Sequence, residues 1–492
     1  MTIREFPEGF KWGASTAAYQ IEGGWNEGGR GMSVWDAFSK TPGKTVNGET
    51  GDKAIDHYHL YKEDVKLMAA MGLKNYRLSI SWPRILPTGK TNIINEEGIA
   101  FYNSLIDELL AHGIEPMVTL YHWDLPLAIA LEHDGWLGKE IVDLFVDYAR
   151  LCFSRFGDRV KNWITLNEPH ISTVLGYGIG VLAPGRKGKI EPYLVGHKML
   201  LTHAAVVHLY RKEFQHEQKG IIGISLNGDY REPKPTNDPA QYKLNQEASE
   251  RALQFVLGWY ADPIYFGDYP EVMKTRLGDR LPKFTEAESK LLKEAGSDFF
   301  GLNHYGTAYV EPSAEFLADE RAGLEGDIWD DVGIVKTDDP SWLKTDVQWN
   351  AVPWGFRKLL TWIHNRYAPP GGIIITENGA AVADVDREAA ENDVFRVKFY
   401  ESYIVEMQKA IAEHGVNVSG YFAWSFIDNY EWAAGYSKRF GIHWVDYNTM
   451  ERVPKASAKF LAQVYKANAV EERDDNMIAL AAPLPTVVAP AP

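Results

Sequence analysis

The sequence predicts an α/β fold, a single (β/α)8 TIM barrel with extended loops at the C-terminal face of the strands. Eight short apolar runs of strand length alternate with stretches whose apolar residues recur every three or four positions, as in amphipathic helices. No Ser/Gly-rich linker or block of like charge divides this alternation. We therefore expect one barrel over residues 1–470 and a charged, then Ala/Pro-rich tail over 471–492 that is disordered.

The predicted strands follow one another along most of the chain. Each is rich in β-branched, aromatic or other apolar residues and is followed by a polar or turn-forming segment. In chain order they are Lys11–Ala14, Asn75–Ile80, Pro116–Tyr121, Trp163–Leu166, Ile221–Leu226, Phe299–Leu302, Ile373–Thr376 and Ser419–Ala423.

A doubly wound sheet is the alternative arrangement of alternating strands and helices. It needs a glycine-rich phosphate-binding turn between an early strand and a helix. The nearest match, Gly176–Gly180, lies in a loop from which no helical pattern starts, so we favour the barrel.

The charge of the chain limits the expected binding partners, and its cysteine content bears on the expected cell compartment. The chain has 51 basic and 67 acidic residues and a net charge of −16, which disfavours nucleic acid and anionic membranes and favours a small neutral substrate. The one cysteine, Cys152, cannot form an intramolecular disulfide, and residues 1–8 contain no apolar signal segment, so we expect a cytoplasmic protein. The sequence leaves open whether it forms a homo-oligomer.

Neither a metal nor another cofactor is expected. The closely spaced histidines His57 and His59 have no cysteine or carboxylate partner at zinc-like spacing, and they open an amphipathic helix. We interpret these two residues as a solvated helix start.

Two glutamates stand at the ends of apolar runs in similar contexts. Glu168 follows Trp163–Asn167 and precedes a proline, and Glu377 follows Ile373–Thr376 and precedes Asn-Gly. Each context is typical of a buried strand that delivers a carboxylate to the edge of a sheet. A single glutamate of this kind is more often structural, but two of them indicate acid/base chemistry on a glycosidic bond.

Polar and aromatic residues collect at the same strand ends. In a barrel of this kind the chemistry lies at the C-terminal ends of the strands. The clusters that follow five of the predicted strands are His122-Trp123-Asp124, Asn167-Glu168-Pro169, Asn303-His304-Tyr305, Glu377-Asn378-Gly379 and Trp424-Ser425-Phe426. Hydrogen-bonding groups together with flat rings match what a sugar requires.

These motifs closely resemble family 1 glycoside hydrolases, the family typified by β-glucosidases. The resemblance rests on Gly9–Gly23, on Asn167-Glu168-Pro169 and on Glu377-Asn378-Gly379, and it extends from about Phe6 to about Tyr465. It implies a retaining mechanism with Glu377 as the nucleophile and Glu168 as the acid/base.

The resemblance also implies roles for further residues. Those that support catalysis are Arg77, Tyr305 and Asn303. Those that contact the glycone, the sugar on the non-reducing side of the bond, are Gln20, His122, Trp123, Asn167, Trp424, Glu431 and Trp432. Those on the side of the aglycone, the leaving group, are Trp349 and His170. Taken alone, His122 and His170 are better explained as loop histidines, and Trp424 as a core residue.

The resulting hypothesis is a retaining β-glucosidase that removes terminal non-reducing β-D-glucosyl residues from small glycosides or cello-oligosaccharides such as cellobiose. β-Galactosyl or β-fucosyl residues are further expected glycones, and transglycosylation accompanies the covalent intermediate. The Glu431-Trp432 pair disfavours a 6-phosphorylated glycone, and Glu168 disfavours thioglucosides, whose specialists in this family carry Gln there. The alternatives are a non-catalytic sugar-binding barrel and, less favoured, a sugar-phosphate isomerase barrel.

Overall fold

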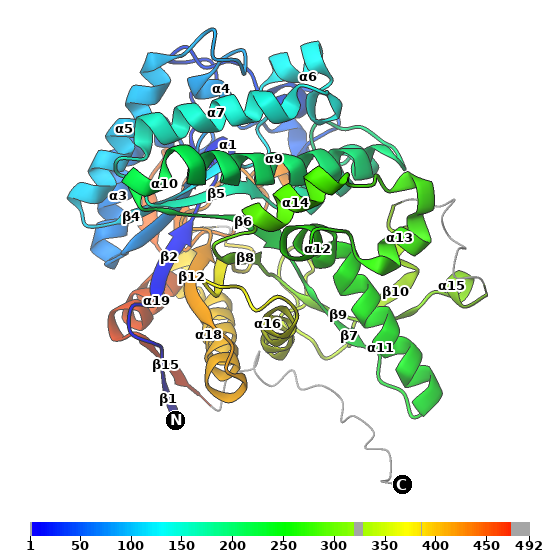
Figure 1. Ribbon diagram of the computed structural model, residues 1–492. Coiled ribbons are helices and arrows are strands. Elements are labelled where there is room, and N and C mark those ends of the chain that lie inside the picture. Colours follow the sequence, from blue (N-terminus) through cyan, green and yellow to red (C-terminus); the bar gives the residue numbers. More distant parts are fainter. Residues whose placement is uncertain (1, 319–327, 385, 474–492) are drawn as a thin grey trace.

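The computed structural model describes residues 2–318, 328–384 and 386–473. Eight parallel strands form a closed barrel in the order β11-β12-β2-β3-β4-β5-β6-β8, which confirms the predicted fold class (Figure 1). The barrel strands are β2 Lys11–Ser15, β3 Asn75–Ser79, β4 Glu115–Tyr121, β5 Asn162–Asn167, β6 Ile221–Asn227, β8 Phe300–Asn303, β11 Ile373–Asn378 and β12 Val418–Trp424.

Every predicted strand corresponds to a barrel strand, with ends that differ by one or two residues. The barrel closes where β12 pairs with β2, with Gly420 opposite Lys11 and Trp424 opposite Ser15. This closure between the first and last strands excludes the doubly wound alternative, whose sheet has two open edges.

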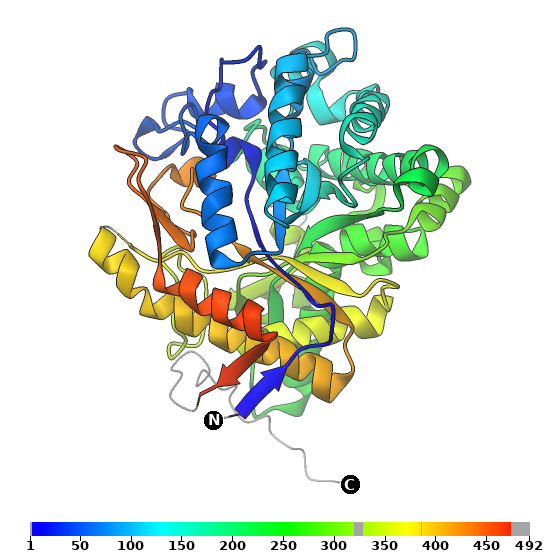
Figure 2. The same ribbon diagram turned by 90° about the vertical axis from the view of Figure 1, so that its left-hand side faces the viewer.

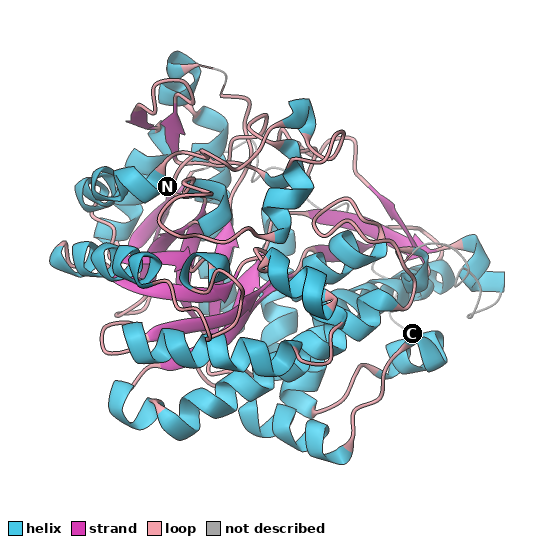
Figure 3. Ribbon diagram, turned by 90° about the horizontal axis from the view of Figure 1, so that it is seen from above, coloured by secondary structure: helices cyan, strands magenta, loops and turns pink. Residues whose placement is uncertain are grey.

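Helices surround the barrel, as the view from above shows (Figure 3). The longer ones are α3 His57–Met71, α5 Glu96–Ala111, α7 Ile141–Phe156, α9 Glu191–Glu213, α11 Pro239–Leu253, α14 Glu286–Ala295, α16 Pro353–Tyr367, α18 Val394–His414 and α19 Ala456–Ala467. The shorter ones are α1 Ala18–Ile21, α2 Val34–Ser39, α4 Trp82–Ile85, α6 Leu127–His133, α8 Pro169–Thr173, α10 Gln215–Gln218, α12 Trp259–Phe266, α13 Glu271–Leu277, α15 Ala314–Ala318 and α17 Arg387–Asn392. Cys152 is buried in α7.

A small apolar cluster, separate from the main core, is built from the barrel strands and the residue before β8. Its buried members are Met117, Ile164, Phe299, Ile374 and Phe422. Gly13 on β2 is required beside it, because a Cβ there would lie 2.4 Å from the ring of Phe422. The polar strand ends that form the site are not part of this cluster.

The extended loops at the C-terminal ends of the strands carry small sheets of their own. One contains β7 Tyr230–Pro233, β9 Thr307–Pro312 and β10 Ile334–Thr337 in the order β10-β9-β7. The loop after β12 contains the hairpin β13 His443–Val445 and β14 Arg452–Pro454. These segments extend the barrel beyond the ends of β6, β8 and β12.

The two ends of the described chain pair with each other. Strand β1 (Thr2–Glu5) is antiparallel to β15 (Ala469–Glu472), and the blue and red arrows lie side by side in Figure 2. Strand β15 therefore continues two residues into the range 471–492 predicted as a disordered tail, because its partner β1 supplies the ladder hydrogen bonds. The rest of that tail, 474–492, lies outside the described residues. Within the described ranges, no helix has the length and apolar character needed to cross a membrane.

Candidate active site

Arg77 connects the strand ends that carry the two candidate carboxylates. It lies on β3, is fully buried, and donates from Nη1 to Glu377 Oε1 at 2.6 Å and from Nη2 to Asn167 Oδ1 at 2.6 Å. Its Nε donates to Thr119 Oγ1 on β4 at 3.2 Å. One guanidinium group thus fixes side chains from β4, β5 and β11 relative to each other.

Glu377 is held at both carboxylate oxygens. Arg77 binds Oε1, and the Tyr305 hydroxyl donates to Oε2 at 2.6 Å. The neighbouring Thr376 hydroxyl donates to Asn303 Oδ1 at 2.6 Å, which links β11 to β8. A carboxylate that accepts two such bonds has little freedom to rotate, so its oxygens have fixed directions.

Glu168 takes a left-handed backbone conformation (φ +45°) between β5 and α8. Its backbone N–H donates to the Ser225 carbonyl at 2.9 Å, and Asn303 Nδ2 donates to its Oε1 at 2.8 Å. A non-glycine residue is uncommon in this region of backbone space, and such strain persists where surrounding contacts hold it. Glu168 is therefore fixed by its backbone as well as by its side chain.

The two carboxyl groups differ in their electrostatic surroundings. Burial, and then the negative charge of Glu377, raises the pKa of Glu168 well above its usual range. Burial also raises the pKa of Glu377, but the Arg77 charge and the Tyr305 hydroxyl act to lower it. Since the Arg77 guanidinium is bound to Glu377, the geometry places the negative charge on Glu377 and the proton on Glu168.

A polar cluster lies at the side of the site formed by the segments after β2, β4 and β12. Gln20 Nε2 donates to Asn429 Oδ1 at 3.0 Å and to Glu431 Oε2 at 3.2 Å. His122 Nε2 accepts from Asn167 Nδ2 at 3.0 Å, which leaves its Nδ1 to carry the proton. In the described part of the chain, Gln20 Oε1 and His122 Nδ1 are both buried with no hydrogen-bond partner. The hydroxyls of a bound ligand can satisfy such atoms.

Aromatic rings enclose this polar cluster. The ring of His122 stacks at 5.8 Å from Trp424 and at 5.9 Å from Trp432, and Trp123 lies 4.6 Å from Trp432. The indole N–H of Trp123 donates to the Asn167 carbonyl at 2.9 Å. Trp123 therefore offers a ring surface, while its N–H group is already used inside the protein.

A cavity of about 310 Å³ opens above Glu168 and Tyr305. The wall of this cavity is largely apolar and includes Ile171, Leu175, Val347, Trp349 and Phe440. Trp349 is 43% exposed, and its ring centroid lies 5.1 Å from that of Tyr305. An exposed ring beside a polar pocket is suited to stack on a sugar or an aromatic leaving group.

His170, predicted on the aglycone side, does not line this cavity. Its ring is buried edge-on against Trp259 at 5.7 Å, and burial lowers its pKa to about 3, so the imidazole is neutral. The next residue, Ile171, lines the cavity instead. The packing explanation of His170 fits the structure better than direct contact with a leaving group.

Three consecutive lining residues were missed by the sequence analysis. Asn227 is the last residue of β6, Gly228 and Asp229 follow it, and all three line the cavity. Asp229 Oδ1 accepts from the backbone N–H groups of Tyr305 and Gly306 at 3.2 and 2.9 Å, so it holds the loop that carries Tyr305. The rule applied to the other strand ends, a polar residue directly after a barrel strand, would have found them.

In the described ranges, no group of three or more His, Cys, Asp or Glu side chains is arranged to hold a metal ion.

Comparison with known proteins decides the family. The family model described as glycosyl hydrolase family 1 matches residues 2–470. The chain belongs to glycosyl hydrolase family 1. Beta-glucosidase 42 of Arabidopsis thaliana is 46% identical over 478 residues, covering 94% of each chain, and Beta-glucosidase 1B of Phanerodontia chrysosporium is 46% identical over 482 residues, covering 95% of this chain and 87% of the relative.

Solved structures of the same family have the same fold. The family 1 β-glucosidase of Thermotoga maritima is 40% identical with a TM-score of 0.87, covering 96% of this chain and 100% of that one. A family 1 β-glucosidase of the fungus Humicola insolens in complex with glucose is 42% identical with a TM-score of 0.88, covering 94% and 99%. This family 1 chain is therefore an O-glycosyl hydrolase with β-glucosidase activity, and the non-catalytic barrel and the isomerase are set aside.

The protonation of Glu431 in this family 1 site gives a first testable prediction. Burial, and then the charge of Glu377, raises the pKa of Glu431 to about 8. In the unfolded chain the pKa of a glutamate is about 4.3. The contribution of Glu431 to the free energy of unfolding is therefore fully present below about pH 4.3, and it is lost as the pH rises through about 8, the pKa of Glu431 in the folded protein. Glu431→Gln cannot ionise. We expect its free energy of unfolding, relative to the wild type, to rise by up to about 1.4 kcal/mol per pH unit between about pH 5 and about pH 8.

Urea unfolding of both proteins across this pH range measures the difference. Glu63→Gln, at an exposed position on α3, is the control, and its difference from the wild type stays constant. A constant difference for Glu431→Gln as well would contradict the raised pKa.

Proposed function

We propose that the chain hydrolyses terminal non-reducing β-D-glucosyl residues with retention of configuration, with Glu377 as the nucleophile and Glu168 as the acid/base. The observation that carries the proposal is the unequal environment of the two buried carboxyl groups. Glu377 has the cation and the hydroxyl donor, whereas Glu168 has an amide donor and a neighbouring negative charge. Such a pair supplies one ionised and one protonated carboxyl group at neutral pH.

In the first step a carboxylate oxygen of Glu377 attacks the anomeric carbon and the bond to the leaving oxygen breaks. The proton of Glu168 passes to that oxygen, so the aglycone leaves as a neutral alcohol. Arg77 and Tyr305 keep the nucleophile ionised and aimed before the attack. Asn303 bonds Glu168 and Asn167 at 2.8 and 3.0 Å, which aligns the acid with the carboxamide that contacts the sugar.

The second step uses the same residues with their charges changed. Once Glu377 is esterified by the sugar its negative charge is gone, and one of the causes that raise the pKa of Glu168 disappears. The ionised Glu168 then takes a proton from water, whose oxygen attacks the anomeric carbon and releases Glu377. Another hydroxyl compound in place of water gives transglycosylation.

The glycone lies, in this proposal, between Glu377 and the polar cluster of Gln20, His122 and Glu431. Asn167, placed by Arg77 beside Glu377, meets the 2-hydroxyl, where hydrogen bonds strengthen in the transition state. Gln20 Oε1 and the Glu431 carboxyl group accept from the hydroxyls farthest from the reacting carbon, including the 6-hydroxyl. Trp424 and Trp432 supply the ring surfaces around the sugar.

The apolar outer cavity with Trp349 accommodates aromatic or sugar leaving groups, which supports small aryl glycosides and cello-oligosaccharides as substrates. The related Humicola insolens enzyme has been solved with glucose, which supports glucose as the glycone. β-Galactosides and β-fucosides remain proposed secondary substrates. A cytoplasmic location stays a prediction.

A substrate panel tests the glycone assignment. We expect turnover of nitrophenyl β-glucoside and at least about 100-fold lower kcat/KM for its 6-phosphate, because the charged phosphate would lose water of hydration beside the half-buried Glu431 carboxyl group. The β-galactoside shows how much the configuration at the 4-hydroxyl affects turnover. The α-glucoside is the control for anomeric specificity. Equal turnover of the phosphorylated substrate, or turnover of the α-glucoside alone, would overturn the proposal.

A further inference from the structure

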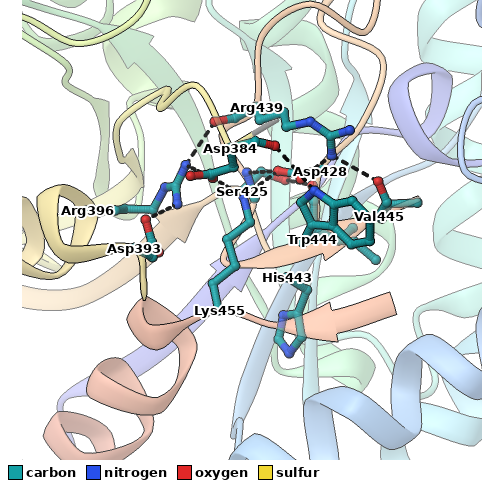
Figure 4. Close-up of polar contacts among 12 residues, drawn as sticks. Asp384, Asp393, Arg396, Ser425, Asp428, Arg439, His443, Trp444, Val445 and Lys455 are labelled. Atoms are coloured by element: carbon teal, nitrogen blue, oxygen red, sulfur yellow. Dashed lines mark hydrogen bonds and ion pairs between the residues drawn. The ribbon is translucent and has the colours of Figure 1, made fainter. Parts of the chain in front are cut away.

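A buried cluster of opposite charges lies behind the loops that follow β11 and β12 (Figure 4). Three carboxylates alternate with three cations, so the charges balance within the cluster. Its members are Asp384, Asp393, Asp428, Arg396, Arg439 and Lys455. Arg439 is the most accessible of them at 14% side-chain exposure, and the others are essentially inaccessible. We call this set the charge cluster.

Lys455 lies at the centre of the charge cluster, directly before α19. Its Nζ donates to Asp384 Oδ2 at 2.6 Å and to Asp428 Oδ1 at 2.9 Å, and Figure 4 shows it between these two carboxylates. Asp384 belongs to the loop after Glu377, and Asp428 belongs to the loop after β12. A single ammonium group therefore joins the two loops that border the site.

The charge cluster attaches the loop after β11 to helix α18. Arg396 on α18 donates from Nε to the Ala380 carbonyl at 3.1 Å and binds Asp384 and Asp393. The backbone N–H of Val382 donates to the Arg439 carbonyl at 3.1 Å. This loop is thus fixed to a long helix.

The other side of the charge cluster shapes the loop that carries Glu431. Asp428 accepts from Gly441 N at 2.9 Å and from Arg439 Nη1 at 2.7 Å, which closes the loop across its base. The next residue, Asn429, accepts from Gln20, and Gln20 binds Glu431.

The backbone conformation of the loop that carries Glu431 is a further reason why contacts must hold this loop in place. Trp432, which follows Glu431, has a left-handed conformation (φ +50°), and for a bulky residue this is strained. Asn429 Nδ2 donates to Ser425 Oγ and to the Ile427 carbonyl, both at 3.0 Å, so the loop is bonded inward toward Asp428. Asp428 thus supports the loop at its base, in addition to the bond at its end from the Glu431 backbone N–H to the Gly435 carbonyl at 2.7 Å.

We propose that Lys455 and Arg439 are positioning residues that act through Asp428 to hold Asn429 and Glu431 against the 6-hydroxymethyl group of the glycone. The proposal rests on the proposed function, which places Glu431 at that end of the sugar. It assigns to the start of the C-terminal helix a part in glycone specificity, although Lys455 touches no substrate. Its loss affects substrates that carry the hydroxymethyl group more than those that lack it.

Lys455→Met tests the proposal with two substrates, the nitrophenyl β-glucoside and the β-xyloside, which differ in that hydroxymethyl group. We expect kcat/KM for the β-glucoside to fall about 10- to 100-fold and for the β-xyloside less than about 3-fold, since a hydrogen-bonding contact to the hydroxymethyl group is misplaced. Arg366→Met is the matched control. It breaks the Arg366–Asp262 ion pair (2.6 Å) between α16 and α12, away from both loops, and leaves the ratio of the two substrates unchanged.

Arg439→Gln covers the case in which Lys455→Met does not fold. It removes the bonds to Asp428 and to the Val445 carbonyl at a less buried position, and the same shift in the substrate ratio is expected. Equal losses on both substrates, or no loss on either, overturn the proposal.

Calorimetric affinities for glucose and xylose give the same comparison without turnover. Absence of β-glucoside hydrolysis by the wild type would refute the proposed function, and an unchanged glucose-to-xylose affinity ratio in the variants would refute the positioning role.

Discussion

Glu377→Ala is expected to lower kcat for nitrophenyl β-glucoside by on the order of 10⁴- to 10⁶-fold, because no other group can form the glycosyl ester. The fold is expected to survive, since the truncation removes a charge whose burial costs free energy. Of the partners left behind, Tyr305 lines the cavity, and Arg77 keeps its hydrogen bonds to Asn167 and Thr119. Initial rates at saturating substrate, with a far-ultraviolet circular dichroism spectrum for each protein, measure the effect.

Azide identifies the cause of the loss. In Glu377→Ala a small anion can enter the space of the missing carboxylate and attack the anomeric carbon from that face, which yields α-glucosyl azide. The control Glu232→Ala removes a carboxylate that is buried on β7 and paired with Lys358, and it retains wild-type rates. A Glu377→Ala protein that keeps more than about one hundredth of the wild-type kcat would refute the role of nucleophile.

Glu168→Gln is expected to give an effect that depends on the leaving group. For a substrate whose leaving alcohol needs protonation, such as cellobiose, kcat/KM falls by about 10²- to 10⁴-fold, the range attributed to general acid catalysis. For a dinitrophenyl glucoside, whose leaving group departs without a proton, kcat/KM changes far less. The second step is slowed for both, because the base is missing.

The pH profile provides the check on this assignment. In the wild type, activity toward cellobiose falls as the pH rises through the raised pKa of Glu168, since the acid form is lost. That limb is absent in Glu168→Gln, whereas Glu232→Gln keeps it. Azide in this variant attacks the glycosyl-enzyme and gives β-glucosyl azide, opposite to the product from Glu377→Ala. The same loss for activated and unactivated leaving groups would contradict the acid role.

Most of the barrel could be predicted from local sequence pattern. Runs such as Ile373–Thr376 and Ile221–Leu226 are apolar on both faces because barrel strands are buried on both sides, and they end at turn-forming residues. Because the C-terminal ends of all barrel strands lie at the same end of the barrel, the positions of Glu168 and Glu377 at strand ends predicted that they lie there together. The motif resemblance added the assignment of their roles.

Contacts between distant segments could not be predicted in this way. The pairing of β1 with β15 joins the two ends of the described chain, and neither strand has a strong apolar pattern. The charge cluster is similar: Lys455 appears in the sequence as an ordinary helix-start lysine, and its burial depends on Asp384 and Asp428 meeting in three dimensions. Sequence pattern identifies which side chains can pair, but topology decides which do.

Individual side-chain directions were also beyond the sequence. His170 follows the acid/base by two residues, yet the α8 turn directs it to Trp259 while Ile171 faces the cavity. Trp123 stands in a sugar-binding motif, yet its N–H is used by the Asn167 carbonyl. The α8 turn sets the direction of His170, and the Asn167 carbonyl accepts the N–H group of Trp123.

The most direct test of the account is to trap the covalent intermediate. A 2-deoxy-2-fluoro-β-glucoside with a dinitrophenolate leaving group forms the glycosyl-enzyme and hydrolyses slowly, because fluorine disfavours the positive charge that develops in the second step. Mass spectrometry of the peptic digest is expected to show one fluoroglucosyl residue on the peptide that contains Glu377 and none in Glu377→Ala. A label on any other residue, or release of dinitrophenolate with no label on the protein, would contradict the mechanism proposed for this site.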